Sequence, residues 1–480
     1  MDWLAAHVWH LVATAALVAL DVATSVHAIL RKRDPRAATL WVAFIWLSPV
    51  IGGFAYIVLG VNRIRRDPAL HRKHEIPELK WDYCQARAVR RLLPEGAAHL
   101  EPLACLGGRL VERPLLPGNH ITPLVNGDEA YPAMLAAIEE ARRTVSLSSY
   151  IFDYDATGRE FAGALERAVR RGVTVRVLVD DAGARYSFPS ILSRLRRSNV
   201  PVARFMPRFI LLRLAALNLR SHRKILVTDG RVGFTGGMNI RHGNRLRAHP
   251  PHPVQDVHFR IEGPVVAQLQ QAFVDDWAWC TGERLAGEAW FPALEEKGDV
   301  LARGITDGPD EDLERIILTL NGAFSAARHS IRLATPYFLP DATMVSALNT
   351  AALRGVAVEI LLPAENNLPF VHWASEAHWW QILLWGCRLW LTPPPFDHSK
   401  LAVVDGCWSF VGSSNLDPRS LRLNFEFNVE AYSRPLAAGL EAIMDRKRAG
   451  AREVTLKDVN ALSLPVRLRD GLARLATPFL

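Results

Sequence analysis

The chain has 480 residues and a formal net charge of +8, with 22% charged and 49% hydrophobic residues. This length allows two globular domains and a membrane anchor, and the positive charge suits either an anionic lipid surface or nucleic acid. The five cysteines are odd in number and lack any C-x-x-C pair, which argues against a disulfide framework and against a zinc site.

Two apolar segments lie near the start of the sequence, residues 8–30 and 37–59. Each has about 23 residues, enough to cross a hydrocarbon core of about 30 Å as an α-helix. A secretory signal peptide fits poorly, because the first segment is too long and no Lys or Arg precedes it. We therefore predict a transmembrane helical hairpin over residues 1–62, although Ser48-Pro49 and Gly52-Gly53 could also bend the second segment into a re-entrant shape.

Basic residues lie both in the turn between these segments and after the second one, so the positive-inside rule does not assign a side of the membrane. Residues 63–120 follow as a connector rich in Arg, His and Pro. Beside a membrane helix, basic clusters attract anionic headgroups by about 1 kcal/mol per residue. We predict that residues 63–120 form a basic juxtamembrane linker, for which a plain solvated connector is the alternative.

From about residue 121 the pattern alternates between strands and helices, and it does so twice. Apolar strands at 144–152 and 173–179 enclose an amphipathic helix at 158–171. The phrase RRGVTVRVLV in this part is answered by LRGVAVEILL farther along the chain. The alternation predicts an α/β fold, and the repetition predicts two halves related by an internal pseudo-twofold axis, residues 121–295 and 296–480.

One short motif is present in each half. It has the spacing H-x-K-x-x-x-x-D, with a glycine 14 residues after the His and an asparagine 17 residues after it. A His, a Lys and an Asp at fixed offsets occur by chance roughly once in ten thousand positions, so two copies with matching tails are not explained by chance. The members are His222, Lys224, Asp229 and Asn239 in the first half, and His398, Lys400, Asp405 and Asn415 in the second.

Each motif begins a predicted β-hairpin, in which two apolar runs flank an Asp-Gly turn. Side chains two positions apart on a strand share a face, so the His and the Lys of each motif point the same way and form an anion site. The glycines let the backbone approach a ligand, and the asparagine can donate a hydrogen bond to a phosphate oxygen. Asp229 and Asp405 complete the motif, but their place before glycine favours bracing of the hairpin over contact with substrate.

A single imidazole cannot be both nucleophile and general acid in the same step, whereas two copies that meet face to face supply both groups. The sequence therefore predicts one active site at the interface between the halves. We expect His222 to be the nucleophile. Arg220 and Arg223 near it favour a neutral imidazole, whereas Asp397 beside His398 favours a protonated one.

The duplicated motif resembles the phospholipase D superfamily. The segments NLRSHRK, GFTGGMNI, FVGSSNLDPRS and LNFEFNVE, together with WVAFIWLSPVIGGFAYIVLGVNR near the N-terminus, resemble bacterial cardiolipin synthases over nearly the whole length. The resemblance implies two phospholipase D-like α/β halves and an N-terminal transmembrane hairpin. It also implies a multi-pass protein of the bacterial inner membrane.

The resemblance further implies a phosphatidyltransferase that joins two phosphatidylglycerol molecules into cardiolipin, releasing glycerol, through a phosphatidyl-histidine. The motif lysines and asparagines would hold the phosphate oxygens, so no metal and no cofactor are expected. The partners implied are phosphatidylglycerol and anionic membrane lipid, without nucleic acid, and the oligomeric state is open. In the resembling family an acid downstream of each motif orients the histidine, a role that we assign to Asp256 for His222 and to Glu426 for His398.

Three alternatives stay open. A phospholipase D hydrolase would use the same residues with water as the acceptor, and a nuclease of the superfamily would use the positive charge. The membrane segments argue against the nuclease. A catalytically inactive membrane-binding scaffold is the third alternative, and the two intact motifs argue against it.

Overall fold

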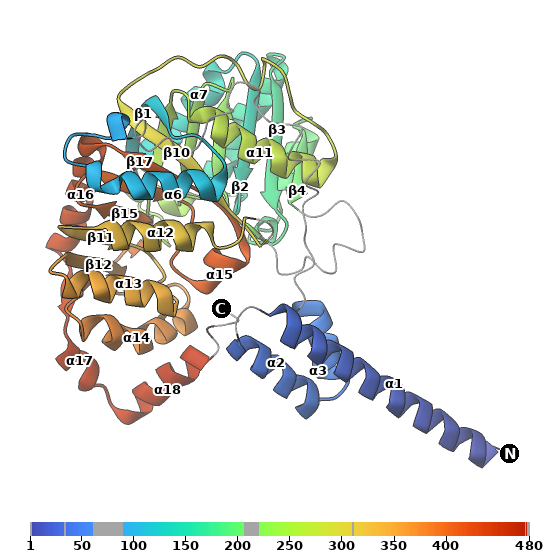
Figure 1. Ribbon diagram of the computed structural model, residues 1–480. Coiled ribbons are helices and arrows are strands. Elements are labelled where there is room, and N and C mark those ends of the chain that lie inside the picture. Colours follow the sequence, from blue (N-terminus) through green and yellow to red (C-terminus); the bar gives the residue numbers. More distant parts are fainter. Residues whose placement is uncertain are drawn as a thin grey trace. The chain divides into compact units, whose positions relative to one another are not determined.

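In the computed structural model of the chain, the described residues are 2–32, 35–60, 90–205, 220–309, 312–475 and 477. They belong to two compact units, residues 1–65 with 207–219, and residues 66–206 with 220–480 (Figure 1). Residues 63–89 of the predicted basic linker lie outside the described range.

The N-terminal unit contains α1 (Asp2–Arg31), α2 (Pro35–Leu47) and α3 (Ile51–Ala55), followed by the π-helical turn η1 (Tyr56–Gly60). Within the part of the chain that the structure describes, Val8–Arg31 is the one stretch long and apolar enough to cross a membrane. The structure therefore supports one span in place of the two that the hairpin prediction required.

The second apolar segment is broken because its helix ends before Pro49. Proline has no N–H and disfavours a continuing helix, and Val50 has a positive φ of 73°. The chain then turns back on itself. A Cβ on Gly52 would lie 2.5 Å from the carbonyl oxygen of Phe44, so only glycine permits this approach of α3 to α2. Two glycines and a proline thus convert a predicted straight span into a bent one.

The second unit is built on one long sheet, whose strands follow the order β18-β13-β12-β11-β15-β16-β17-β10-β1-β9-β7-β6-β2-β3-β4. The elements of the first half are β1 (Leu116–Val125), α7 (Asn126–Glu140), β2 (Thr144–Ser149), α8 (Ala156–Arg170), β3 (Thr174–Asp180), α9 (Ile191–Arg197), β4 (Val202–Phe205), β6 (Ile225–Thr228), β7 (Val232–Gly236), β9 (Val257–Glu262) and α11 (Val266–Thr281).

The elements of the second half are β10 (Val300–Asp307), α12 (Arg315–Ala326), β11 (Ser330–Ala334), α13 (Ala342–Leu353), β12 (Ala357–Pro363), α14 (Pro369–Leu383), β13 (Arg388–Thr392), β15 (Leu401–Val404), β16 (Trp408–Gly412), α15 (Pro418–Arg422), β17 (Asn424–Tyr432), α16 (Arg434–Ala449), β18 (Arg452–Val454), α17 (Leu456–Asn460) and α18 (Leu464–Leu475). The predicted strands and helix at 144–152, 173–179 and 158–171 correspond to β2, β3 and α8.

The order of strands is the same on both sides of the antiparallel β1–β10 pair at the centre. Moving outward, β1-β9-β7-β6-β2-β3-β4 corresponds to β10-β17-β16-β15-β11-β12-β13. The strands β2, β3 and β4 of the first half and β11, β12 and β13 of the second are parallel, and the hairpin of each half is antiparallel. In the second half β18 adds an antiparallel strand at the edge. This arrangement confirms the predicted α/β fold with two pseudo-twofold-related halves.

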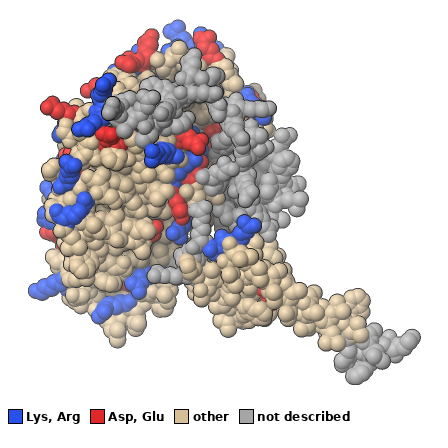
Figure 2. All heavy atoms as spheres, viewed as in Figure 1, with Lys and Arg blue, Asp and Glu red and all other residues tan. Residues whose placement is uncertain are grey.

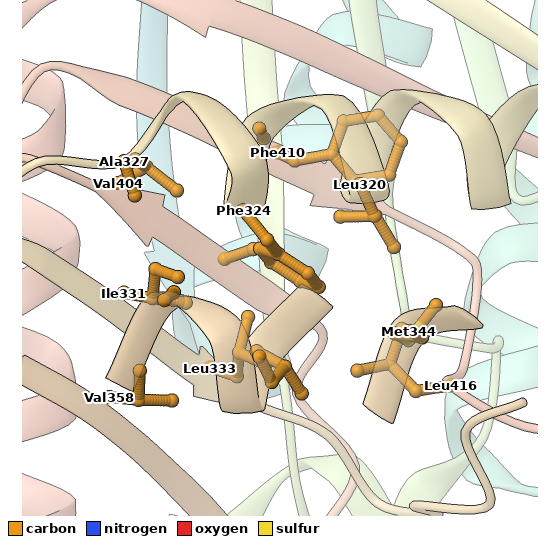
Figure 3. Packing of buried hydrophobic residues seen from close by; sticks show 14 of the residues in the cluster. Leu320, Phe324, Ala327, Ile331, Leu333, Met344, Val358, Val404, Phe410 and Leu416 are labelled. Carbon is orange, nitrogen blue, oxygen red and sulfur yellow. The ribbon is translucent and has the colours of Figure 1, made fainter. Parts of the chain in front are cut away.

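Each half has its own apolar core. In the second half, Leu320 and Phe324 of α12 face Ile331 and Leu333 of β11 (Figure 3). The helix α6 (Glu101–Val111) contributes Leu103 and other residues to the same core. The C-terminal part of the predicted linker is therefore folded onto the second half, because its apolar residues have a core to join. The strand β1 likewise begins at Leu116, before the predicted boundary at residue 121.

Candidate active site

Short parallel strand pairs bring the two motifs together. The strand β5 (Arg220–Ser221), just before the first motif, pairs with the start of β17, and the amide of His222 donates to the carbonyl of Phe425 at 2.9 Å. The strand β14 (Phe396–Asp397) pairs in the same way with β8 (Val254–Gln255) of the first half. Each histidine segment is therefore docked on the chain directly before the acid of the opposite half.

The histidine–acid pairs consequently cross between the halves. His222 Nδ1 lies 2.9 Å from Glu426 Oε1, and His398 Nδ1 lies 2.9 Å from Asp256 Oδ2. The sequence-based pairing of Asp256 with His222 and of Glu426 with His398 is thus wrong, although both acids do lie against a motif histidine. Its error was to assume that each half supplies its own acid, whereas the β5–β17 and β14–β8 contacts exchange them.

Both lysines are buried next to their histidines. Lys224 Nζ donates to the carbonyl of His222 at 2.6 Å, and Lys400 Nζ donates to the carbonyl of His398 at 2.5 Å. Burial lowers the pKa of Lys224 to about 7 and that of Lys400 to about 8, against the raising effect of nearby carboxylates. The negative charge of a bound phosphate would stabilise the protonated lysines and raise their pKa values again. The two lysines therefore form a site prepared for an anion.

The imidazoles are neutral at neutral pH. Burial, followed by the charge of Lys224, lowers the pKa of His222 well below its usual value. Burial and the charge of Lys400 lower the pKa of His398 to about 4. Burial also raises the pKa of Glu426 to about 7, against the charge of Lys224. A neutral imidazole that donates through Nδ1 keeps a lone pair on Nε2, which is the form a nucleophile requires.

The surroundings of the two imidazoles differ. His222 Nδ1 lies 2.9 and 3.1 Å from the two oxygens of Glu426, and the imidazole also has a backbone hydrogen bond to Ser413. His398 Nδ1 lies 2.9 Å from Asp256 and also 2.9 Å from the ammonium of Lys400. A lysine donating to Nδ1 would place the ring proton on Nε2. The carboxylate of Glu426 thus favours a proton on Nδ1 of His222, whereas Lys400 favours a proton on Nε2 of His398.

Two tyrosines contact the imidazoles, Tyr150 directly after β2 and Tyr337 three residues after β11, although the strand registers align Tyr150 with Pro336. The ring of Tyr150 lies 5.2 Å from that of His222, and the ring of Tyr337 lies 6.2 Å from that of His398. Sequence reasoning gave these tyrosines no role. Comparing Ser149-Tyr150 with Pro336-Tyr337 in the sequence brings both tyrosines to notice, although the structure aligns Ser149 with Thr335.

The aspartates of the motifs brace the fold. Asp229 accepts hydrogen bonds from the backbone amides of Arg142, Arg143 and Thr144, and Asp405 does the same for the chain before β11. The strand β6 separates Lys224 from Asp229, a distance of roughly 15 Å along the strand. The structure therefore places Asp229 and Asp405 outside the reacting centre, as their position before glycine predicted, although they complete the catalytic motif.

The motif asparagines are not equivalent. Asn239 uses its amide oxygen to accept from the backbone of Ile151 at 3.0 Å, and its amide nitrogen has no partner among the described residues. The side chain of Asn415 hydrogen-bonds to Asp417, while its amide oxygen is buried without a partner. Asn239 is thus the better placed of the two to donate to a phosphate.

The glycines of the motif tails make room for the protein itself. A Cβ on Gly237 would lie 2.6 Å from Asp256 Oδ1, so this glycine permits the acid to reach His398. The equivalent residue in the second half is Ser413, whose hydroxyl donates to Glu426. We predicted that the glycines of the motif tails let the backbone approach a ligand. In the structure, this position instead holds the two acids in place: Gly237 leaves room for Asp256, and Ser413 donates to Glu426. Ser413 is a functional residue that the sequence pattern did not single out.

The charges expected to distinguish the histidines are neutralised by buried partners. Asp397 accepts from Lys447 at 2.9 Å and from Ser399, which lowers the pKa of Asp397 despite its burial. Arg223 is paired with Asp276 at 2.8 Å. The sequence-based argument for His222 as nucleophile therefore fails in its stated form, and the contacts at Nδ1 replace it.

Comparisons with known proteins match this arrangement. A family model described as "Cardiolipin synthase, PLD-like domain" matches residues 134–277 and 320–448, and one described as "Phospholipase_D-nuclease N-terminal" matches residues 19–60. Cardiolipin synthase A of Pseudomonas putida strain GB-1 is 32% identical over 469 residues, which is 96% of each chain. Cardiolipin synthase A of Pseudomonas fluorescens strain Pf-5 is 31% identical over 486 residues, which is 100% of each chain.

Among solved structures, a phosphatidylserine synthase of Haemophilus influenzae Rd KW20 has the same fold. It aligns with a TM-score of 0.62 at 15% identity and covers 79% of this chain and 100% of its own. The family model, the full-length relatives and the duplicated motif together show that this chain belongs to the cardiolipin synthase family, with phospholipase D-like halves.

Proposed function

We propose that the chain is a membrane-bound cardiolipin synthase, a phosphatidyltransferase that converts two phosphatidylglycerol molecules into cardiolipin and glycerol. The observation that supports it most directly is the crossed pair of histidine–acid contacts, each with a buried lysine beside it. Two neutral imidazoles and two cations are the groups that a two-step transfer at phosphorus requires.

In the first step, Nε2 of His222 attacks the phosphorus of phosphatidylglycerol. The bond between phosphorus and the glycerol oxygen breaks. His398 gives its Nε2 proton to that oxygen while its Nδ1 takes a proton from Lys400, 2.9 Å away, so that the ring stays neutral and glycerol leaves. A phosphatidyl group is now bound to His222 through a P–N bond. Glu426 stabilises the positive charge that His222 acquires, because the acid accepts from Nδ1.

In the second step, Nε2 of His398 removes a proton from a hydroxyl group of another phosphatidylglycerol, while Nδ1 returns its proton to Lys400. The resulting oxygen attacks phosphorus, the P–N bond breaks, and both histidines return to their starting states. Lys224, Lys400 and Asn239 stabilise the non-bridging oxygens, on which negative charge accumulates in both steps. Nearby, burial raises the pKa of Asp417 to about 6, against the lowering effect of its hydrogen bonds with Ser420 and Asn415.

The location that fits this activity is the bacterial inner membrane, where the lipid substrates are. The apolar helix Val8–Arg31 supports membrane attachment by length and composition. The broken second segment is compatible with a re-entrant element in place of a second span.

The decisive experiment follows the products of labelled phosphatidylglycerol. The purified full-length chain, reconstituted in vesicles, should convert the label into cardiolipin with release of one glycerol for each cardiolipin. A hydrolase would give phosphatidic acid instead, and an inactive scaffold would give neither product. Phosphatidic acid as the main product, with no cardiolipin, would overturn the transferase assignment.

A further inference from the structure

The C-terminal helix α18 (Leu464–Leu475) has two contrasting faces. On one face, Ala473 is buried and packs with Leu339 and Ala374, so α18 lies against α14. Asp470 is buried on the same face, next to Arg469 at 2.7 Å. This face fully explains how the helix is attached to the second unit.

The opposite face is a line of exposed leucines. Leu464, Leu468, Leu472 and Leu475 are between 58% and 68% exposed. At about 100° per residue, these four positions fall within an arc of roughly 80°, centred opposite the buried face. Contiguous exposed apolar side chains of this kind mark an interaction surface, because leaving them in contact with water contributes nothing to the stability of a monomeric protein.

Charge identifies the kind of partner. Arg467 and Arg474 lie on one edge of the leucine face, and neither forms an ion pair with a described carboxylate. Arg469 lies on the other edge, where it stacks on Trp373 at 4.7 Å. The only acid of the helix, Asp470, is on the buried face. Figure 2 shows blue basic atoms beside a largely tan surface at the end of the second unit where α17 and α18 lie in Figure 1.

An apolar line with arginines at its edges fits phospholipids better than it fits a second copy of the chain. Amphipathic helices with basic edges lie in the bilayer interface, their apolar face among the acyl chains and their cations at the phosphates. A twofold contact between two copies would instead place the arginines of each helix beside the leucines of the other. The arginines would then have no carboxylate partner, because the acid of α18, Asp470, is buried.

The helix is also close to the site. Leu339, which packs with Ala473 of α18, lies two residues after Tyr337, whose ring contacts His398. The geometry points to α18 as an interfacial docking helix, with Leu464, Leu468, Leu472 and Leu475 inserted into an anionic bilayer and Arg467 and Arg474 at its phosphates. It would hold the second half against the surface from which lipid headgroups are taken. Docking needs no turnover, so it stands or falls separately from the proposed reaction.

The test measures contact between α18 and lipid in the full-length chain. An environment-sensitive fluorophore is attached to Leu468→Cys in a His222→Ala chain whose five native cysteines have been replaced. The matched control is Leu353→Cys in the same background, because Leu353 is 65% exposed at the C-terminal end of α13. This end leads into the start of β12, whereas Leu339 follows the end of β11, so the two positions lie at opposite ends of the parallel strands. Both are reconstituted in vesicles with and without phosphatidylglycerol, and quenched with spin-labelled lipids.

The expected result is quenching at position 468 several-fold stronger than at position 353 in phosphatidylglycerol vesicles. Arg467→Gln with Arg474→Gln should lower it to the level seen in purely zwitterionic vesicles. Equal quenching at the two positions would overturn the proposal, as would quenching at 468 that is independent of lipid charge. A blue shift at 468 without quenching, together with the mass of a dimer, would show that a second copy covers the leucines and would also overturn it.

Discussion

The two halves share an order of strands but differ in how they hold the acid that orients the opposite histidine. Glu426, in the second half, accepts hydrogen bonds from His222, Ser413 and Asn424. Asp256, in the first half, contacts His398 and its neighbouring backbone amide, with Gly237 where the other half has serine. A repeated scaffold therefore produces two unequal imidazoles, and in the proposed reaction one attacks phosphorus while the other transfers protons.

The largest expected effect follows from removing either histidine. His222→Ala and His398→Ala should each lower phosphatidyl transfer by roughly a thousandfold or more, because nucleophilic attack and proton transfer are both lost or left unassisted. The rate is measured with labelled phosphatidylglycerol. Membrane insertion and thermal unfolding serve as controls for folding. Near-normal transfer by either variant would contradict a single shared site.

The different roles proposed for the two histidines can be tested by trapping the covalent phosphatidyl-histidine intermediate. Because Asp256 contacts His398, Asp256→Asn should impair the proton removal of the second step and allow a covalent intermediate to accumulate. After a short incubation with labelled phosphatidylglycerol, mass spectrometry should find the phosphatidyl group on His222. Glu426→Gln should accumulate less, because it impairs His222 itself. Label on His398 alone would reverse the two roles and keep the crossed pairing.

Gly237 and Ser413 occupy the same position in the two halves and should respond differently. Gly237→Ala adds a carbon 2.6 Å from Asp256 Oδ1, which must displace the acid from His398, and we expect a loss of about 100-fold. Ser413→Ala removes one hydrogen bond to Glu426, and we expect about tenfold.

A control variant, Gly439→Ala, should be neutral, because a Cβ there has no neighbour within 4 Å. The steady-state transfer rates of the three variants are compared with that of the original chain. Wild-type activity in Gly237→Ala would show that Asp256 does not need its observed position.

The smallest effect concerns pH. The pKa values of about 7 for Lys224 and about 8 for Lys400 lie below the ordinary lysine value because of burial. The cationic form is present below these values and is lost as pH rises through them. The ratio kcat/KM should therefore fall several-fold between about pH 7 and 9. In Lys400→Arg the arginine stays charged, so the part of the decrease in kcat/KM that comes from Lys400, at the higher pH values, should be absent. A profile that is flat up to pH 9.5 in the original chain would contradict the role of the lysines.

Local patterns in the sequence predicted the repeated strands, the hairpins and the residues of the motifs. They did so because apolar periodicity and turn residues act over a few positions. The acid partners could not be predicted in this way. His222 and Glu426 are 204 residues apart, and His398 and Asp256 are 142 apart. Their pairing depends on two-residue strands that have no periodicity to detect.

Two other differences have equally physical causes. Apolar composition favoured a second membrane span, with a bend at Ser48-Pro49 and Gly52-Gly53 as the alternative, and the structure has the bend. Neighbours in sequence suggested that Asp397 would act on His398, yet its charge is matched by Lys447 from α16. Composition and adjacency identified the segments but could not show which distant groups they meet.

The exchange of acids between halves has a consequence for how such a chain could arise. A single half, translated alone, would have a histidine and a lysine but no acid against the imidazole, so it would depend on a twin to complete it. Such an ancestor would have functioned only as a symmetric pair, with two identical sites forced to change together. Joining the twins in one polypeptide removed that constraint, since glutamate with serine on one side and aspartate with glycine on the other can then be altered one at a time. Fusion, in this view, made specialisation of the two histidines possible.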